Sequence, residues 1–108
     1  MNEKNKSLNQ LPYSEEAELA VLGSMLSSKE AVSKSIQWLT IDYFYKESHG
    51  KIFGIMVELF EKGEPVDTVA VIDLLKQKKF LDSVGGTYFI TGLVDMVPTA
   101  AHVDQYSK

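Results

Sequence analysis

The stretch Ser48–Pro65, SHGKIFGIMVELFEKGEP, determines how the rest of the chain must pack. At about 100° per residue its apolar side chains share one broad arc of a helical wheel, opposite a narrow polar strip. The broad arc contains Ile52, Phe53, Ile55, Met56, Val57, Leu59 and Phe60. An arc this wide indicates a helix that is covered on several sides. We therefore predict a central helix over Ser48–Lys62, ended by a left-handed Gly63 and by Pro65.

Length and composition indicate one ordinary globular domain. The chain has 108 residues, of which 44% are hydrophobic and 24% charged, and its net charge of −4 argues against a strong nucleic-acid-binding surface. The absence of cysteine excludes disulfides and thiolate metal ligands and fits a reducing cytoplasm. No apolar run is long enough to span a membrane, and the polar residues 1–10 predict a disordered arm rather than a signal peptide.

Two helices and a short turn are predicted before the central helix. Ser14 is a good N-cap for a helix over Glu15–Leu26, whose first-turn glutamates favour the positive end of the helix dipole. Ser27 and Glu30 form the pattern of a capping box for the second helix, which should turn Val32, Ile36 and Leu39 inward. The aromatic run Tyr43-Phe44-Tyr45 is expected to lie in the core.

The segment Val66–Val71 is ambiguous by propensity, because its β-branched residues also suit a strand. Asp67 is a strong N-cap, and Val66 with Val71 has the spacing of a hydrophobic staple, so we predict a helix here. After the turn at Gly85-Gly86, a short helix over Thr87–Val97 is expected to bury Tyr88 or Phe89. A last helical segment then begins at Thr99 and is still helical in pattern at Lys108.

Candidate catalytic groups all have simpler structural explanations. The chain contains no glycine-rich phosphate loop and no GK[ST] motif. Dipole complementation explains Glu15, Glu16 and Glu18 without acid/base catalysis, and the lysines of residues 76–79 fit a solvated helix end. His49 lies on the apolar arc and is expected to be a satisfied, partly buried histidine. We therefore predict no catalytic, cofactor or metal site in this chain.

A series of motifs in a fixed order resembles the N-terminal domain of the bacterial replicative DNA helicase, the DnaB type. The resemblance covers about Leu11 to Lys108, and its departures are an added aromatic at Tyr43 and His102 in place of a common Asn. The motifs are Pro12-x-x-x-Glu16-Ala17-Glu18-x-x-Val21-Leu22-Gly23, Asp42-Tyr43-Phe44-Tyr45, His49-x-x-Ile52-Phe53, Lys62-Gly63-Glu64-Pro65-Val66-Asp67-x-Val69-x-Val71, Val84-Gly85-Gly86 and Val97-Pro98-Thr99-Ala100-Ala101-x-Val103-x-x-Tyr106.

The resemblance implies an all-α domain of about six helices over residues 11–98, with residues 99–108 beginning a helical hairpin. Such domains form the collar of six-membered rings, pair subunits and dock the primase, in a cytoplasmic replisome that also engages a helicase loader. ATP and Mg²⁺ belong to a RecA-like C-terminal domain that this sequence does not contain. The chain itself is then not an enzyme, and alone it is expected to be a monomer or weak dimer.

Four residues are candidates for partner binding. On matching positions the resemblance points to Glu16 and Phe89 for the primase. Val103 and Tyr106 share one face of the last segment and need an apolar partner. The alternative functions are a stand-alone helical adaptor or regulator, which fits the acidity and the lack of an active site, and a small all-α hydrolase.

Overall fold

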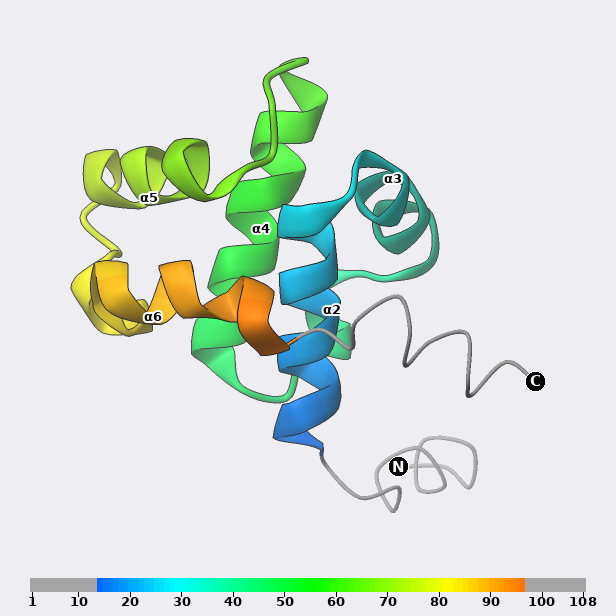
Figure 1. Ribbon diagram of the computed structural model, residues 1–108, viewed down its shortest axis with the longest axis horizontal. Coiled ribbons are helices and arrows are strands. Elements are labelled where there is room, and N and C mark those ends of the chain that lie inside the picture. Colours follow the sequence, from blue (N-terminus) through cyan, green and yellow to red (C-terminus); the bar gives the residue numbers. More distant parts are fainter. Residues whose placement is uncertain (1–13, 97–108) are drawn as a thin grey trace.

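A computed structural model describes residues 14–96 (Figure 1). This part of the chain is helical and contains no strand, which confirms the all-α prediction. Its α-helices are α2 (Glu15–Ser27), α3 (Lys29–Trp38), α4 (Glu47–Glu61), α5 (Thr68–Gln77) and α6 (Gly86–Gly92). Two short 3-10 helices lie between them, η1 (Ile41–Tyr43) and η2 (Asp82–Val84), and a third, η3 (Leu93–Met96), follows α6. The predicted arm 1–10 and hairpin start 99–108 lie outside the described residues.

Helix α4 is the centre of the domain, one residue earlier in the chain than predicted. In Figure 1 it runs through the middle, with α2 and α3 on one side and α5 and α6 on the other. Helices α2, α3 and α5 and the turns η1 and η2 all contact it. Its buried apolar residues are Ile52, Phe53, Ile55, Met56 and Leu59. Each such large side chain contributes roughly 1.5–3 kcal/mol when fully buried, so α4 anchors the core.

Two aromatic expectations for the core were wrong. Phe60 shares the apolar arc of α4, yet 42% of it is exposed. It lies in the last turn, where it faces a hollow between the α2–α3 junction and the α4–α5 loop rather than another helix. In the run Tyr43–Tyr45 only Phe44 is buried, and its ring packs on Phe53 at 5.0 Å between centroids.

The N-caps follow the sequence at two of three helices. Ser14 accepts the N–H of Ala17 at 3.0 Å, and Asp67 accepts the N–H of Ala70 at 2.8 Å. The cap of α5 confirms that Val66–Val71 leads into a helix. The predicted capping box at Ser27 was wrong, because α2 continues through Ser27 and Ser28 caps α3 instead.

Helices α4 and α5 end in the same hydrogen-bond pattern. Beyond α4, Glu64 N–H donates to the Leu59 carbonyl at 2.9 Å, and Gly63 N–H donates to the Phe60 carbonyl at 3.0 Å. This is a Schellman motif, with Gly63 in the left-handed region at φ 74°. The equivalent position after α5 is Lys79, at φ 64°. A left-handed C′ position thus carries glycine after one helix and lysine after the other.

The predicted helix over Thr87–Val97 is divided in the structure. Helix α6 covers Gly86–Gly92, and the chain then tightens into η3. Ile90 is the buried apolar residue of α6, and Leu93 is that of η3. Leu93 is also the first residue of η3, which packs beside α2. No helix within residues 14–96 has the length and apolar character needed to cross a bilayer.

Candidate partner-binding surface

A buried polar network joins α2 to α4. The Glu18 carboxylate is 2.8 Å from Nδ1 of His49 and also accepts the N–H of Tyr45 at 2.7 Å. Glu18 is 4% exposed and His49 is 1% exposed. A carboxylate only accepts hydrogen bonds, so Nδ1 is the donor nitrogen of His49 in this arrangement. His49 is a satisfied histidine, as predicted, but it is wholly rather than partly buried.

Dipole complementation was an incomplete explanation for Glu18. Its partner His49 lies 31 residues further along the chain, so no local pattern identifies the pair. One sequence signal was available, because Glu18 shares a helical face with Leu22 and Met25 at i, i+4 and i+7. Both of these residues are fully buried, and the face they define places Glu18 in the interior.

The ring of Phe89 stacks on this network. Its centroid is 6.4 Å from that of the His49 imidazole, and the two planes differ by 8°. Gly85, which precedes α6, has φ 119°, and a Cβ there would lie 2.8 Å from the Phe89 ring. The glycine therefore allows both the turn and the close approach of this ring. Phe89 is half-buried, whereas its neighbour Tyr88 is 92% exposed.

The four predicted partner-binding residues have different placements. Glu16 is exposed in the first turn of α2 and forms no ion pair among residues 14–96. Phe89 keeps part of its surface accessible on α6. No hydrogen bond joins the two, but their helices are linked through Glu18 and His49. Val103 and Tyr106 lie outside the described residues.

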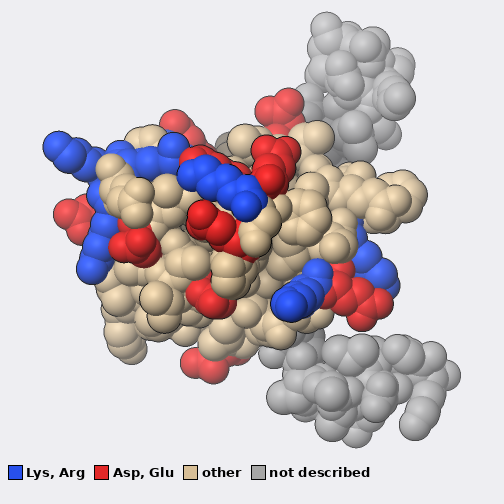
Figure 2. Space-filling view, turned by 90° about the horizontal axis from the view of Figure 1, so that it is seen from above, with Lys and Arg blue, Asp and Glu red and all other residues tan. Residues whose placement is uncertain are grey.

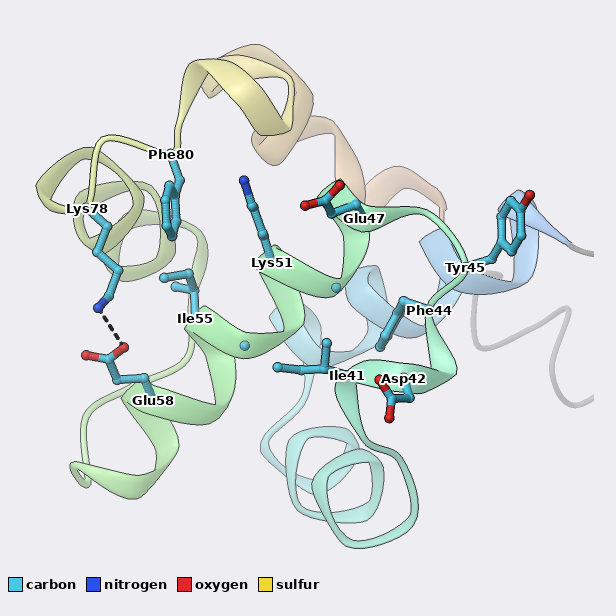
Figure 3. A pocket seen from close by; sticks show the side chains of 12 residues that line it. Ile41, Asp42, Phe44, Tyr45, Glu47, Lys51, Ile55, Glu58, Lys78 and Phe80 are labelled. Carbon is cyan, nitrogen blue, oxygen red and sulfur yellow. Dashed lines mark ion pairs between the residues drawn. The ribbon is translucent and has the colours of Figure 1, made fainter.

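Sequence reasoning missed a second surface, in the segment from the end of α3 to the start of α4. Trp38, Ile41, Tyr43 and Tyr45 are all exposed there. Ile41 and Tyr45 line an open hollow of about 580 Å³ along α4, shown in Figure 3. The aromatic residues were expected in the core because Lys46 is the only basic residue next to them in the sequence, and charge alone does not distinguish a core from an apolar surface.

Some of the charged side chains form ion pairs, and charges of both signs lie close together. On the face shown in Figure 2, acidic and basic groups are interleaved. Glu58 is 3.1 Å from the amine of Lys78 and 3.3 Å from that of Lys62. The hydrogen bond from Lys78 has the largest effect, and together with the one from Lys62 it holds the pKa of the Glu58 carboxyl below its ordinary value. Among residues 14–96 no group of three or more His, Asp or Glu side chains could hold a metal ion.

The helical fold agrees with the family comparison. The family model described as the DnaB-like helicase N terminal domain matches residues 10–108. The chain belongs to the DnaB-like helicase N-terminal domain family. The matched range includes every described helix, from α2 to α6, together with η3.

Named relatives of this DnaB-like domain are replicative helicases. The replicative DNA helicase DnaC of Bacillus subtilis (strain 168) is 40% identical over 97 residues, which is 90% of this chain and 21% of the relative. The replicative DNA helicase DnaB of Geobacillus stearothermophilus is 39% identical over the same shares of each chain. The chain thus spans about a fifth of the length of these curated relatives.

A solved structure supports the same assignment. The crystal structure of the N-terminal domain of DnaB helicase from Mycobacterium tuberculosis superimposes with a TM-score of 0.79 at 35% sequence identity. The match covers 91% of this chain and 68% of that one. The DnaB-like domain therefore shares its helical architecture, and not only its sequence motifs, with a known member of the family.

Proposed function

We propose that this chain acts in DNA replication as the collar domain of a replicative helicase, where it assembles subunits and docks the primase. The observation that carries the proposal is the family match over residues 10–108 together with relatives that are named replicative DNA helicases. Most of the length of those relatives lies outside the matched region. We therefore assign three activities to a longer protein that contains this domain. They are unwinding with ATP and Mg²⁺, formation of the six-membered ring and engagement of a loader.

Primase docking is proposed on the exposed parts of α2 and α6. Glu16 supplies a carboxylate that forms no ion pair among residues 14–96. Phe89 supplies a ring whose position is fixed by Gly85 and the His49 imidazole. Tyr88 adds an almost fully exposed ring one residue away. Fixed aromatic residues lose little conformational freedom on binding, and tyrosine is enriched among residues that dominate interface energies.

Titration of the chain with the C-terminal domain of a primase from the same organism tests the docking proposal. We expect Glu16→Ala, Tyr88→Ala and Phe89→Leu each to weaken binding. Tyr43→Ala is the matched control, because Tyr43 is an exposed ring on η1, away from α6. Circular dichroism would establish that each variant is folded. Unchanged affinity in the folded variants would remove these residues from the docking surface.

Three further observations distinguish a helicase collar domain from a stand-alone adaptor protein. Reading the gene beyond the codon for Lys108 should show a domain that carries a GK[ST] motif, and a stop codon instead would favour the adaptor. Single-stranded DNA should bind the chain weakly, since acidic and basic groups are interleaved and the net charge is −4. Sedimentation at micromolar concentration measures how far the chain associates alone.

A further inference from the structure

Several exposed apolar side chains lie in one short segment, and two of them, Ile41 and Tyr45, line an open hollow. Residues 38–45 carry Trp38, Ile41, Tyr43 and Tyr45, which are all among the exposed large hydrophobic residues. Ile41 lies on one side of the open trough of about 580 Å³, Phe80 with Lys78 lies on the opposite side, and Tyr45 lies at the end beyond Phe44 (Figure 3). Exposed apolar side chains rimmed by charged residues are typical of a protein interaction site in a soluble domain.

The floor of the trough is one stripe of α4, from Glu47 to Glu58. At a rise of 1.5 Å per residue this stripe is about 16 Å long, which suits a short peptide segment better than a compact small molecule. Gly50 and Gly54 lie in the floor, and a Cβ at these positions would be 3.3 Å and 3.4 Å from the Ile41 side chain. The glycines thus seat Ile41 low against α4, with 54% of it still exposed.

The charges of the trough are unevenly balanced. At the α5 end, the Lys78 amine is neutralised by Glu58 at 3.1 Å. The Lys51 amine lies over the Phe80 ring, 4.7 Å from its centroid. At the opposite end Asp42 and Glu47 are both exposed, and neither forms an ion pair among residues 14–96. Figure 3 shows these two carboxylates on either side of Phe44.

We propose that this trough binds a short segment of another protein that carries aliphatic side chains and at least one Lys or Arg. The aliphatic side chains lie between Ile41 and Phe80, and the basic group lies at the end bounded by Asp42 and Glu47. The charged residues that line the trough are Asp42, Glu47 and Glu58 against Lys51 and Lys78, and this excess of one negative charge favours a basic segment over an acidic one. The site is formed by η1, α4 and the end of α5, so it is separate from the proposed docking surface on α2 and α6 and does not depend on it.

Three synthetic peptides would test the chemistry by ¹H–¹⁵N NMR titration of the whole chain. The first combines leucine and lysine, the second replaces every lysine by glutamate, and the third replaces every leucine by serine. We expect the leucine–lysine peptide to bind with a dissociation constant on the order of 100 µM. Its shifts should map to residues 41–58 and 78–80. Equal binding of the glutamate peptide, or shifts confined to other helices, would overturn the proposal.

Two matched pairs of variants locate the site. Glu47→Lys should weaken the leucine–lysine peptide roughly fivefold, as expected for reversing one surface charge, while Glu61→Lys at the far end of α4 should not. Ile41→Ala should also weaken binding, and Val69→Ala, at an exposed aliphatic residue of α5, should not. If Ile41→Ala does not fold, the Glu47 and Glu61 pair still decides. A dimer seen by sedimentation that Ile41→Ala abolishes would place a second copy in the trough and would contradict the proposed occupant.

Discussion

The carboxylate of Glu18 lies 2.8 Å from Nδ1 of His49, and this pair connects α2 to the central helix α4 inside the domain. The second carboxylate oxygen accepts the N–H of Tyr45, which fixes the chain just before α4 begins. Phe89 of α6 stacks on the same imidazole. One buried carboxylate therefore sets the relative positions of three helices, two of which form the proposed primase-docking surface.

Removal of the Glu18 carboxylate should destabilise the domain strongly. In Glu18→Ala the N–H of Tyr45 and Nδ1 of His49 both lose their acceptor, and each unsatisfied buried group costs about 1–3 kcal/mol. We expect a total loss of about 2–5 kcal/mol in the free energy of unfolding, measured by urea denaturation. Glu16→Ala is the control and should stay within about 0.5 kcal/mol. Equal losses in the two variants would show that the network contributes nothing to stability.

Two phenylalanines of α4 should respond differently to truncation. Phe53 is 1% exposed, so Phe53→Ala should cost about 3–5 kcal/mol through lost burial and a residual cavity. Phe60 is 42% exposed and faces an open hollow, so Phe60→Ala should cost less than about 2 kcal/mol. The comparison uses the urea midpoints and slopes of both variants. A Phe60 loss as large as that of Phe53 would mean that the hollow is closed in solution.

Asp67 should stabilise α5 through its cap. Its side chain accepts the N–H of Ala70 at 2.8 Å, which satisfies one of the free donors of the first turn. Asp67→Ala should lose about 1 kcal/mol in thermal or urea unfolding, whereas Asp67→Asn should keep most of the stability. If Asn and Ala were equally destabilising, the negative charge rather than the hydrogen bond would be the source of the effect.

The local features of this fold were predictable because short-range rules determine them. The apolar arc of α4 identified the central helix to within one residue, and Asp67 with the Val66–Val71 spacing identified α5 against a strand alternative. The left-handed Gly63 followed from the preference of glycine for positive φ. The capping box failed by one residue at Ser27, because Ser27 and Ser28 are equally good caps by type, and the Ser27 hydroxyl instead donates to the Gly23 carbonyl at 2.9 Å within α2.

The features that depend on distant contacts were not predictable. Glu18 and His49 are 31 residues apart, and neither residue indicates its partner. The exposure of Tyr43 and Tyr45 depends on which helices cover the segment around η1. Among the described residues η1 packs mainly against α4, and there Phe44 is buried while both tyrosines stay exposed. Glu16 and Phe89 came from the family resemblance, and the structure adds that Phe89 is anchored against His49.

Lys79 should be replaceable by glycine with a gain in stability. It occupies the left-handed C′ position of α5 at φ 64°, where a residue with a Cβ is strained by roughly 1–2 kcal/mol relative to glycine. Lys79→Gly should therefore raise the free energy of unfolding by about 0.5–1 kcal/mol, partly offset by the greater freedom of glycine in the unfolded chain. Gly63→Ala is the reciprocal control and should destabilise α4. A loss in Lys79→Gly would show that the lysine side chain makes a compensating contact.

Glu58 should make stability depend on pH in the acid range. Hydrogen bonds from Lys78 and Lys62 lower the pKa of its carboxyl in the folded state relative to the unfolded chain. The unfolded state then binds more protons across the interval between the two pKa values, so stability rises with pH in that interval. The contribution of Glu58 is fully present above the unfolded pKa and is lost as pH falls through the folded pKa.

Urea denaturation at a series of pH values between neutral and acidic measures this effect. The free energy of unfolding should change less steeply with pH in Glu58→Gln than in the wild type. High salt should reduce the difference, because these ion pairs are partly exposed. Parallel pH profiles for wild type and Glu58→Gln at low salt would show that Lys78 and Lys62 do not hold this carboxylate in solution.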